Sequence, residues 1–354
     1  MKLLMCSPRL PPDEWSGAGR AFLDLVRHAR PHMEVRLVSG WHRDRAMVPA
    51  EAVAVELGGL SVSSARWRFG RAVHDEVRRF KPDIVVSRTL SLPPLPCPFV
   101  DVVQQIVRVV PRPRDQLRRR AFATAARRAA AVVVPDAATA RHLTAAGLPE
   151  GKLRVIPVGV DTSEFRSDPS GLAARIDGRM HIVVTGRILP EKGQHLALDA
   201  VARLPAREKR QVRLTIAGSI GDPVYLDQLR VQAWSQPVDF VLDPIRIAPV
   251  LQSADLAVVP SIVEAGFSTS VVEAMACGLP VVWFDQPAVR EATGGRGVPV
   301  PADDVTALRQ ALRDLLADAG KRERLGADGR RYVLGALSWD RTWAQWSRLL
   351  HGLV

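Results

Sequence analysis

Residues 255–284, DLAVVPSIVEAGFSTSVVEAMACGLPVVWF, contain the pattern that decides the fold. A short apolar run (255–260) leads into a turn that contains glycine, then into a short apolar helix and a second apolar run (280–284). Gly278 stands where a helix-ending glycine is expected. A strand, a helix and another strand in this order form a β-α-β unit, which is typical of a parallel sheet covered by helices.

The same alternation extends through the rest of the chain. Further strands are expected over residues 2–7, 35–40, 83–87, 99–103, 131–135, 181–186, 213–218 and 238–242, with helix-like stretches between them. The chain has 354 residues, more than one domain usually holds. We therefore expect an α/β protein of two doubly wound, Rossmann-like domains.

The domain boundaries follow from a polar stretch that contains Pro and Gly at residues 166–178, which is the best linker candidate. We expect an N-terminal domain over 1–165 and a C-terminal domain over 178–335. A last helix over 336–354 is expected to pack back toward the N-terminal domain. Its three tryptophans are interpreted as an ordinary packing stripe: Trp339, Trp343 and Trp346.

Composition places the protein in the cytoplasm. No run of about 18 apolar residues is present, which excludes a membrane-spanning helix. The first residues, MKLLMCSPRL, are too short an apolar run for a signal peptide. The three cysteines follow no metal-ligand spacing and are expected to be buried and reduced: Cys6, Cys97 and Cys277.

Positive charge is concentrated in the first half of the chain. Residues 1–170 contain 27 Lys and Arg against 17 Asp and Glu, whereas residues 171–354 contain 22 against 20. Such a surplus indicates an anionic partner, either an anionic acceptor or an anionic membrane at its inner face. An arginine-rich composition without any such partner remains the alternative. The basic cluster comprises Arg112, Arg114, Arg118, Arg119, Arg120, Arg127 and Arg128.

Several catalytic motifs are absent. The chain has no P-loop, no G-x-G-x-x-G after the first strand and no G-x-S-x-G elbow. No Asp-x-Asp pair occurs, which argues against a diphosphate held by a metal. Three loops at strand ends remain as candidate sites, because ligands of doubly wound sheets bind beyond the carboxyl ends of the strands.

The first loop covers residues 185–193 and carries Arg187 and Lys192. Two cations that frame a helix N-terminus suit a pair of phosphates, since the helix dipole and the free N–H groups add to their charge. The ordinary alternative is a pair of solvated loop cations.

The second loop covers residues 260–280 and places Glu273 in the first turn of an apolar helix. Glu273 either binds a ligand or forms a capping box with Ser270. The third loop, residues 15–20, is a turn of small residues that lets the backbone approach a ligand closely, or a plain turn before the first helix.

Together these loops resemble glycosyltransferase family 4, the retaining transferases of the GT-B fold. Residues 155–165, VIPVGVDTSEF, are similar to the interdomain segment "IPNGVD…F", with Val158 in place of Asn. Residues 183–204, VVTGRILPEKGQHLALDAVARL, are similar to the donor loop. Residues 254–282, ADLAVVPSIVEAGFSTSVVEAMACGLPVV, are similar to the most specific signature of the family.

The resemblance implies two domains that face a cleft, and it implies roles for individual residues. Arg187 and Lys192 hold the donor diphosphate, and Glu273 binds the ribose hydroxyls. With Glu264, the two cations are the expected catalytic residues. The other expected donor-binding residues are Ser16, Gly17, Gly19, Gly186, Gly266, Phe267, Ser268 and Thr269.

The sequence departs from the family pattern at two places. Seven residues usually separate the two signature glutamates, but eight separate Glu264 from Glu273, and Ala265 occupies the aligned position. Either a bulge lets Glu264 serve, which we favour, or that carboxylate is absent. In addition, Val103, Gln104 and Gln105 stand where many members carry a sugar-contacting histidine.

The resemblance implies transfer of a hexose-like sugar from a UDP- or GDP-linked donor, with retention and without a cofactor or metal. The acceptor is a lipid-linked, polysaccharide or natural-product hydroxyl. Two alternatives stay open. One is a GT-B nucleotide-sugar epimerase, and the other is a basic nucleic-acid-binding protein. We do not expect a nucleic-acid partner, because the chain lacks the interleaved aromatic residues that bind single strands.

Overall fold

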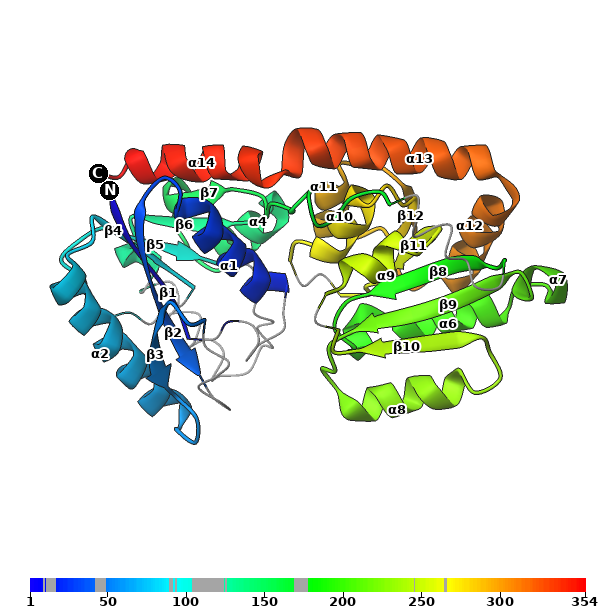
Figure 1. The fold of residues 1–354 in the computed structure, drawn as a ribbon, viewed down its shortest axis with the longest axis horizontal. Helices are drawn as coiled ribbons and strands as arrows, with labels where there is room; N and C mark the ends of the chain where they lie inside the picture. Colours follow the sequence, from blue (N-terminus) through cyan, green and yellow to red (C-terminus); the bar gives the residue numbers. More distant parts are fainter. Residues whose placement is uncertain are drawn as a thin grey trace. The chain divides into compact units, whose positions relative to one another are not determined.

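The computed structural model describes residues 1–8, 10, 17–41, 49–88, 92, 94–103, 124, 126–168, 178–244, 246–263 and 266–354. The chain divides into two compact units, one of residues 1–158 with 340–354 and one of residues 159–339. Each unit is built on its own parallel sheet (Figure 1). The chain therefore passes between the units twice.

The first unit contains a seven-stranded sheet in the order β3-β2-β1-β4-β5-β6-β7, with all neighbouring strands parallel. The order reverses between β1 and β4, as in doubly wound folds. The strands are β1 (Lys2–Ser7), β2 (Glu34–Trp41), β3 (Ala52–Glu56), β4 (Ile84–Ser87), β5 (Phe99–Val102), β6 (Ala131–Val134) and β7 (Leu153–Val155).

Helix α2 (Val62–Phe80) shows how sequence positions a helix on this sheet. Its apolar residues Phe69, Val73 and Val77 recur every four positions, so they lie on one face and pack in the core against β1 and β4. The Ser61 side chain accepts a hydrogen bond from the Ser64 N–H and begins the helix. The other helices of this unit are α1 (Gly17–Ala29), α4 (Ala137–Ala145), η2 (Glu150–Lys152) and α14 (Trp339–His351).

The second unit contains a six-stranded parallel sheet in the order β10-β9-β8-β11-β12-β13. Its strands are β8 (Met180–Thr185), β9 (Val212–Gly218), β10 (Val238–Leu242), β11 (Leu256–Val259), β12 (Val281–Phe284) and β13 (Val298–Val300). Its helices are η3 (Pro190–Lys192), α6 (Gln194–Ala202), α7 (Ala206–Lys209), α8 (Pro223–Gln232), α9 (Ala248–Gln252), α10 (Thr269–Ala276), α11 (Pro287–Thr293), α12 (Val305–Ala317), α13 (Ala319–Tyr332) and η4 (Val333–Leu337).

Helices cover both faces of this second sheet. Ile182 and Val184 of β8 pack in a core with α6, α8 and α12, whereas Val183 between them packs in a core with α9 and α10. Successive side chains of a strand point to opposite faces, which is why one strand serves both cores. The expected architecture of two doubly wound α/β units is confirmed.

Several expectations differ in detail from the structure. Strands β3, β7 and β13 were not expected from the sequence; all three are short edge strands, and β7 and β13 have three residues each. The tryptophan stripe of α14 is buried, as expected, and Trp343 stacks on His32 with ring centroids 5.4 Å apart. The cysteines are free, but Cys97 is only half-buried. Within the described ranges, no helix is both long and apolar enough to span a bilayer.

Asp101 of β5 is a charged residue buried completely in the core of the first unit. Neither carboxyl oxygen makes a hydrogen bond of normal geometry to a described residue. Burial raises the pKa of Asp101 from 3.8 to about 8, and the nearby backbone N–H of Val102 opposes the shift only in part. The carboxyl is therefore mostly protonated at neutral pH.

This raised pKa makes the stability of the protein depend on pH. Between about pH 4 and pH 8 the Asp101 carboxyl is protonated in the folded state but ionised in the unfolded state. The contribution of this proton to the free energy of unfolding is therefore complete below about pH 4 and is lost as pH rises toward 8. We expect the melting temperature to fall across this window and Asp101→Asn to flatten the fall, a difference of a few kcal/mol. Thermal melts from pH 4 to pH 9 test this. The control Asp75→Asn, at an exposed helix position, should keep the wild-type slope, and equal slopes in all three proteins would contradict the prediction.

Candidate functional site

The loop after β8 is anchored to the end of β9 by its backbone. The Gly186 N–H donates to the Ala217 carbonyl at 3.0 Å, and the Ile188 N–H donates to the Ser219 carbonyl at 2.9 Å. Ile188 is completely buried. Because Arg187 lies between these two anchored residues, its backbone position at the carboxyl end of the sheet is fixed.

Arg187 and Lys192 form a pair of half-buried cations on this loop. Burial lowers the pKa of the Lys192 ammonium, the neighbouring charge of Arg187 lowers it further, and Glu191 opposes both effects. Within the described part of the chain, neither cation has a hydrogen-bond or ion-pair partner. Two mutually repelling cations that form no ion pair within the described residues are a candidate site for a doubly charged anion.

The loop from β11 to α10 lies beside this loop. The Ile262 N–H donates to the Glu191 carbonyl at 3.0 Å. Gly193, with a φ of 69°, approaches so closely that an added Cβ would lie 1.9 Å from the Pro260 carbonyl oxygen. A Cβ on Gly186 would likewise lie 3.4 Å from the Ser270 hydroxyl oxygen. The structure thus brings two of the three candidate loops together.

Helix α10 corrects the interpretation of Glu273. The helix begins at Thr269 with Ser268 as the N-cap residue, so Ser270 is already inside it and Glu273 lies in its second turn. The capping-box alternative is therefore wrong, as is the expected place in the first turn. Ser270 and Glu273 are three positions apart and share a face, and Ser270 adjoins Gly186. Glu273 consequently lies half-buried on the side of the helix that borders the donor loop.

The N-terminus of α10 borders the same loop. Ser268 makes no side-chain capping bond in the described structure, and Gly266 enters the turn with a φ of 93°. Phe267 packs against the apolar core beneath the helix. The helix ends as expected, because Gly278 has a φ of 81° and the Leu279 N–H donates to the Ala274 carbonyl.

The N-terminus of α6 differs from expectation. Its amides were expected to be free for a phosphate, but the Tyr225 hydroxyl accepts the His195 N–H at 3.1 Å and contacts His195 Nδ1 at 2.8 Å. The Leu196 N–H donates to the Gly193 carbonyl. Burial raises the pKa of Tyr225 to about 12, although the backbone N–H groups of residues 194 and 195 oppose this. The His195 and Leu196 amides are therefore already bonded, and the candidate anion site consists of the side chains of Arg187 and Lys192.

Gln194 and Tyr225 contact the residues of the candidate site, and sequence reasoning missed both. The Gln194 side chain is 1% exposed, and its Nε2 donates to the Arg187 carbonyl at 2.8 Å. Tyr225 reaches the start of α6 from α8, thirty positions away in the chain. Contacts between residues so far apart leave no local pattern in the sequence, so Tyr225 could not have been found from it. Gln194 could have been, because it directly follows Lys192-Gly193 in the donor loop.

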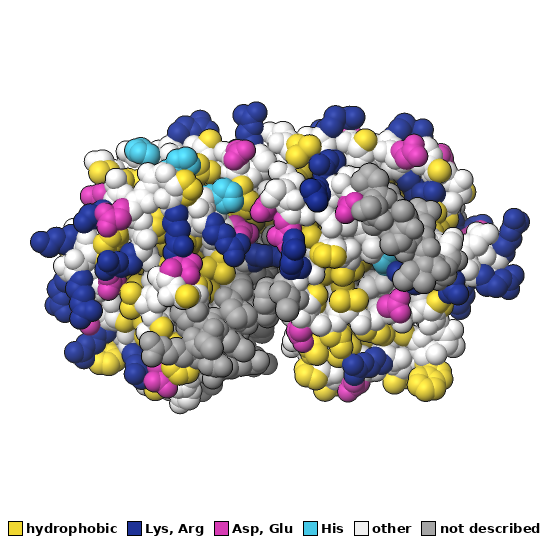
Figure 2. Space-filling model, in the orientation of Figure 1, with side chains coloured by type: hydrophobic (Ala, Val, Ile, Leu, Met, Phe, Trp, Pro, Cys, Tyr) yellow, Lys and Arg dark blue, Asp and Glu magenta, His cyan; other side chains and the backbone are white. Residues whose placement is uncertain are grey.

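The remaining predicted residues are placed only in part. Ser16, Glu264, Gln104, Gln105 and Arg112–Arg120 of the basic cluster lie outside the described residues. Gly17 and Gly19 belong to the first turn of α1 rather than to the expected turn before it. Arg127 and Arg128 are exposed. Figure 2 shows further Lys and Arg side chains along the edge of the first unit near α2, which carries Arg66, Arg68, Arg71, Arg78 and Arg79.

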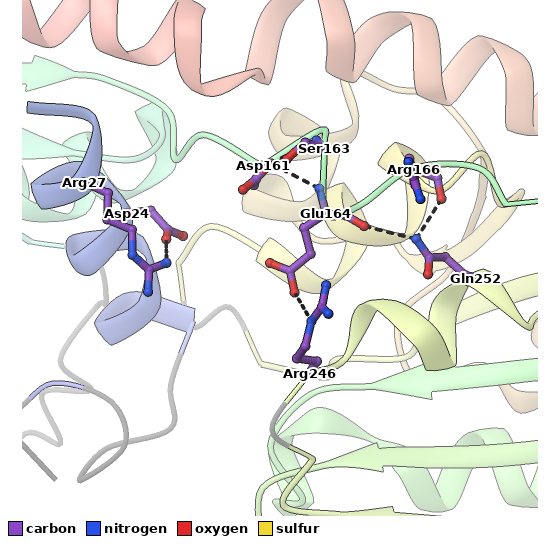
Figure 3. A network of polar contacts seen from close by, with 8 residues as sticks. All are labelled: Asp24, Arg27, Asp161, Ser163, Glu164, Arg166, Arg246 and Gln252. Atoms are coloured by element: carbon purple, nitrogen blue, oxygen red, sulfur yellow. Dashed lines mark hydrogen bonds and ion pairs between the residues drawn. The ribbon is translucent and has the colours of Figure 1, made fainter. Parts of the chain in front are cut away.

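The segment 159–166 is held against α9 by the contacts drawn in Figure 3. Asp161 Oδ1 accepts the Ser163 N–H at 2.9 Å and closes a turn. Gln252 Nε2 donates to the carbonyls of Glu164 at 3.1 Å and Arg166 at 3.3 Å. The Glu164 carboxylate also forms an ion pair with Arg246, with Oε1 and Nε 3.4 Å apart. Asp24 and Arg27, also drawn there, form a separate ion pair on α1.

Two family models match the chain, one on each side of the passage between the units. The model described as Glycosyltransferase Family 4 matches residues 15–164, and the model described as Glycosyl transferases group 1 matches residues 179–318. The chain belongs to glycosyltransferase family 4. The sequence resemblance to this family is thereby confirmed.

Curated relatives in this family match mainly over part of their length. An MMP α-(1→4)-mannosyltransferase of Mycolicibacterium hassiacum is 31% identical over 223 residues, which are 60% of this chain and 52% of the relative. A D-inositol 3-phosphate glycosyltransferase of Geodermatophilus obscurus is 35% identical over 205 residues, 53% and 44% of the two chains. The matched region spans about half the length of these relatives.

Solved structures resemble the whole chain. The structure of Anabaena Alr3699/HepE in complex with UDP has a TM-score of 0.81, 20% identity and full coverage of both chains. WaaG, a glycosyltransferase involved in lipopolysaccharide biosynthesis, has a TM-score of 0.76, 16% identity and 99% coverage of both. Together with the two parallel sheets, these likenesses establish the GT-B fold of this family 4 member.

Proposed function

We propose that the protein is a retaining glycosyltransferase, which moves a hexose-like sugar from a nucleoside diphosphate sugar to an acceptor hydroxyl. The observation that carries the proposal is the pair of adjacent cations, Arg187 and Lys192, neither of which forms an ion pair within the described residues. A diphosphate supplies a negative charge for each of the two cations. Membership of family 4 and the UDP-bound relative of the same fold support this choice.

The reaction places its main electrostatic demand on this pair of cations. The bond from sugar C1 to the diphosphate oxygen breaks, so negative charge grows on the leaving oxygen while the acceptor oxygen bonds to C1. The acceptor proton passes to the leaving diphosphate, so no protein base is required. Cations held in place before the reaction stabilise that charge without reorganisation. Glu273, on the α10 face that borders the loop, is proposed to accept hydrogen bonds from the donor ribose.

The remaining parts of the proposal concern the partners. Glu264 is proposed as a second carboxylate for the donor sugar. The donor carries UDP or GDP, and neither a cofactor nor a metal is part of the proposal. The positive surplus of the first 170 residues supports an anionic acceptor or one presented at an anionic membrane. Neither the epimerase nor the nucleic-acid alternative gains support from the relatives.

A thermal-shift panel tests the donor class. UDP, GDP, ADP and their glucose and mannose conjugates are added one at a time, and the melting temperature is recorded. A ligand at one hundred times its dissociation constant stabilises the protein by about 2.7 kcal/mol, so a cognate nucleotide shifts the melt by several degrees. We expect UDP or GDP to shift the melt and inorganic sulfate not to do so. A melting temperature that no nucleotide or nucleotide sugar raises above that of the free protein would reject the proposal.

A further inference from the structure

We infer that Gln194 is a positioning residue for Arg187, which holds the guanidinium in place for the diphosphate through a bond to the Arg187 backbone. The inference rests on the proposed function and adds a residue to its site. Gln194 is the first residue of α6, directly after Lys192-Gly193. Its side chain turns back over the loop, and Nε2 donates to the Arg187 carbonyl oxygen at 2.8 Å.

This hydrogen bond holds the carbonyl of the planar peptide whose N–H, that of Ile188, donates to the Ser219 carbonyl. The N–H groups on either side of Arg187 are bound by β9 and the turn after it, and the Ile188 carbonyl accepts the N–H groups of Gly221 and Asp222. The Arg187 carbonyl instead receives the Gln194 amide. Both polar groups of the peptide between residues 187 and 188 are thus held, and together they fix the ψ angle of Arg187, which sets the direction in which its side chain leaves the loop.

The start of α6 is itself firmly held, which lets Gln194 act as a fixed point. Tyr225 of α8 binds the His195 N–H at 3.1 Å and the His195 ring at 2.8 Å. Gly193 packs against the Pro260 carbonyl. A side chain positions its partner only when its own backbone cannot move, and both contacts provide this.

The unused half of the Gln194 amide argues against a purely structural role. Oε1 is buried and has no hydrogen-bond partner in the described part of the chain. An unpaired buried acceptor costs stability, which offsets what the Nε2 bond contributes. A leucine of similar volume would remove this cost but would leave the Arg187 carbonyl without a donor, so the two effects oppose each other. We therefore expect the net effect of Gln194 on stability to be small and its main effect to be the position of Arg187.

The test uses two substitutions and one matched control. Gln194→Glu keeps the shape but loses the N–H donor, and Gln194→Leu keeps the approximate volume but loses both polar atoms. Gln232→Glu is the control, because Gln232 Nε2 also donates to a backbone carbonyl at the start of α6, that of His195 at 3.0 Å, yet lies on the exposed side. Binding of UDP, GDP and inorganic pyrophosphate is measured by calorimetry, and slow hydrolysis of the best-bound nucleotide sugar reports turnover.

We expect both Gln194 variants to melt within a few degrees of wild type, to bind the best diphosphate about tenfold more weakly at pH 8 and to turn over about tenfold more slowly. The Gln232→Glu variant should match wild type in both measurements. As pH falls toward 5.5, Gln194→Glu should regain affinity relative to wild type, because a protonated carboxyl donates to the Arg187 carbonyl whereas a carboxylate only repels it. Gln194→Leu should regain nothing.

The outcomes separate this inference from the proposed function. If the wild type binds neither UDP, GDP nor pyrophosphate, the proposed function fails, and the inference fails with it. If the wild type binds a diphosphate but both variants bind and turn over within twofold of it, the positioning role alone is overturned. A loss in Gln194→Glu that follows the wild-type pH profile would also overturn it, because a general loosening of the fold has no reason to reverse with protonation.

Discussion

Lys192→Ala is expected to lower turnover by about two to three orders of magnitude while the melting temperature stays near that of wild type, and Arg187→Ala is expected to do the same. Each cation is half-buried and forms no ion pair with a described residue. Its removal therefore deletes charge stabilisation of the leaving diphosphate without breaking an internal ion pair. Removing a repelled cation also spares the fold an electrostatic cost, so the variants should remain folded.

The measurement is release of nucleoside diphosphate from the sugar donor identified by the thermal-shift panel, with thermal melts of each variant. Arg207→Ala serves as the control, because Arg207 is an exposed cation of α7, which leads into the amino end of β9, away from the strand ends that carry the site. Arg207→Ala should retain full turnover. Turnover near the wild-type level in both Lys192→Ala and Arg187→Ala would remove the basis for the proposed function.

Gly193→Ala is expected to destabilise the second unit by more than about 4 kcal/mol, which is at the upper end for one substitution. Gly193 has a φ of 69°, which a residue with a Cβ adopts at a cost. The added Cβ would also lie 1.9 Å from the Pro260 carbonyl oxygen. That oxygen belongs to backbone and cannot rotate away, so the two donor loops must separate.

Chemical denaturation of Gly193→Ala and Gly295→Ala separates the two contributions. Gly295 has a φ of 76°, but nothing lies within 4 Å of its Cβ position, so Gly295→Ala reports the cost of the backbone conformation alone. We expect that control to lose about 1 kcal/mol. Equal losses in the two variants would show that the close approach to Pro260 contributes nothing.

The sequence was sufficient to predict the architecture and the composition of the donor loops. Strands β1 and β10 were placed to the residue, because their apolar runs are clear and their ends are flanked by turn residues. The short edge strand β13 was missed, since three residues with a proline carry almost no periodic signal. Local pattern predicts elements well when they are long and flanked by such residues.

The site was predicted less completely, because part of it depends on contacts between distant residues. The capping-box alternative for Glu273 failed because the helix starts two residues earlier than that motif requires. The N–H groups at the start of α6 were expected to be free, but the Tyr225 hydroxyl accepts the hydrogen bond of the His195 N–H. Tyr225 belongs to a different helix, so the sequence near residue 194 gives no indication of this contact. The place of Glu264 stays a prediction, as it lies outside the described residues.

The two passages of the chain between the units have a consequence for synthesis. The second unit is one uninterrupted stretch, residues 159–339, whereas the first unit receives its last helical segment only with residues 340–354. A ribosome therefore releases every residue of the second unit before Trp343 reaches the ring of His32, on which it stacks. The unit encoded first is the one completed last, and until then it exposes the apolar surface that Trp343 and Trp346 cover.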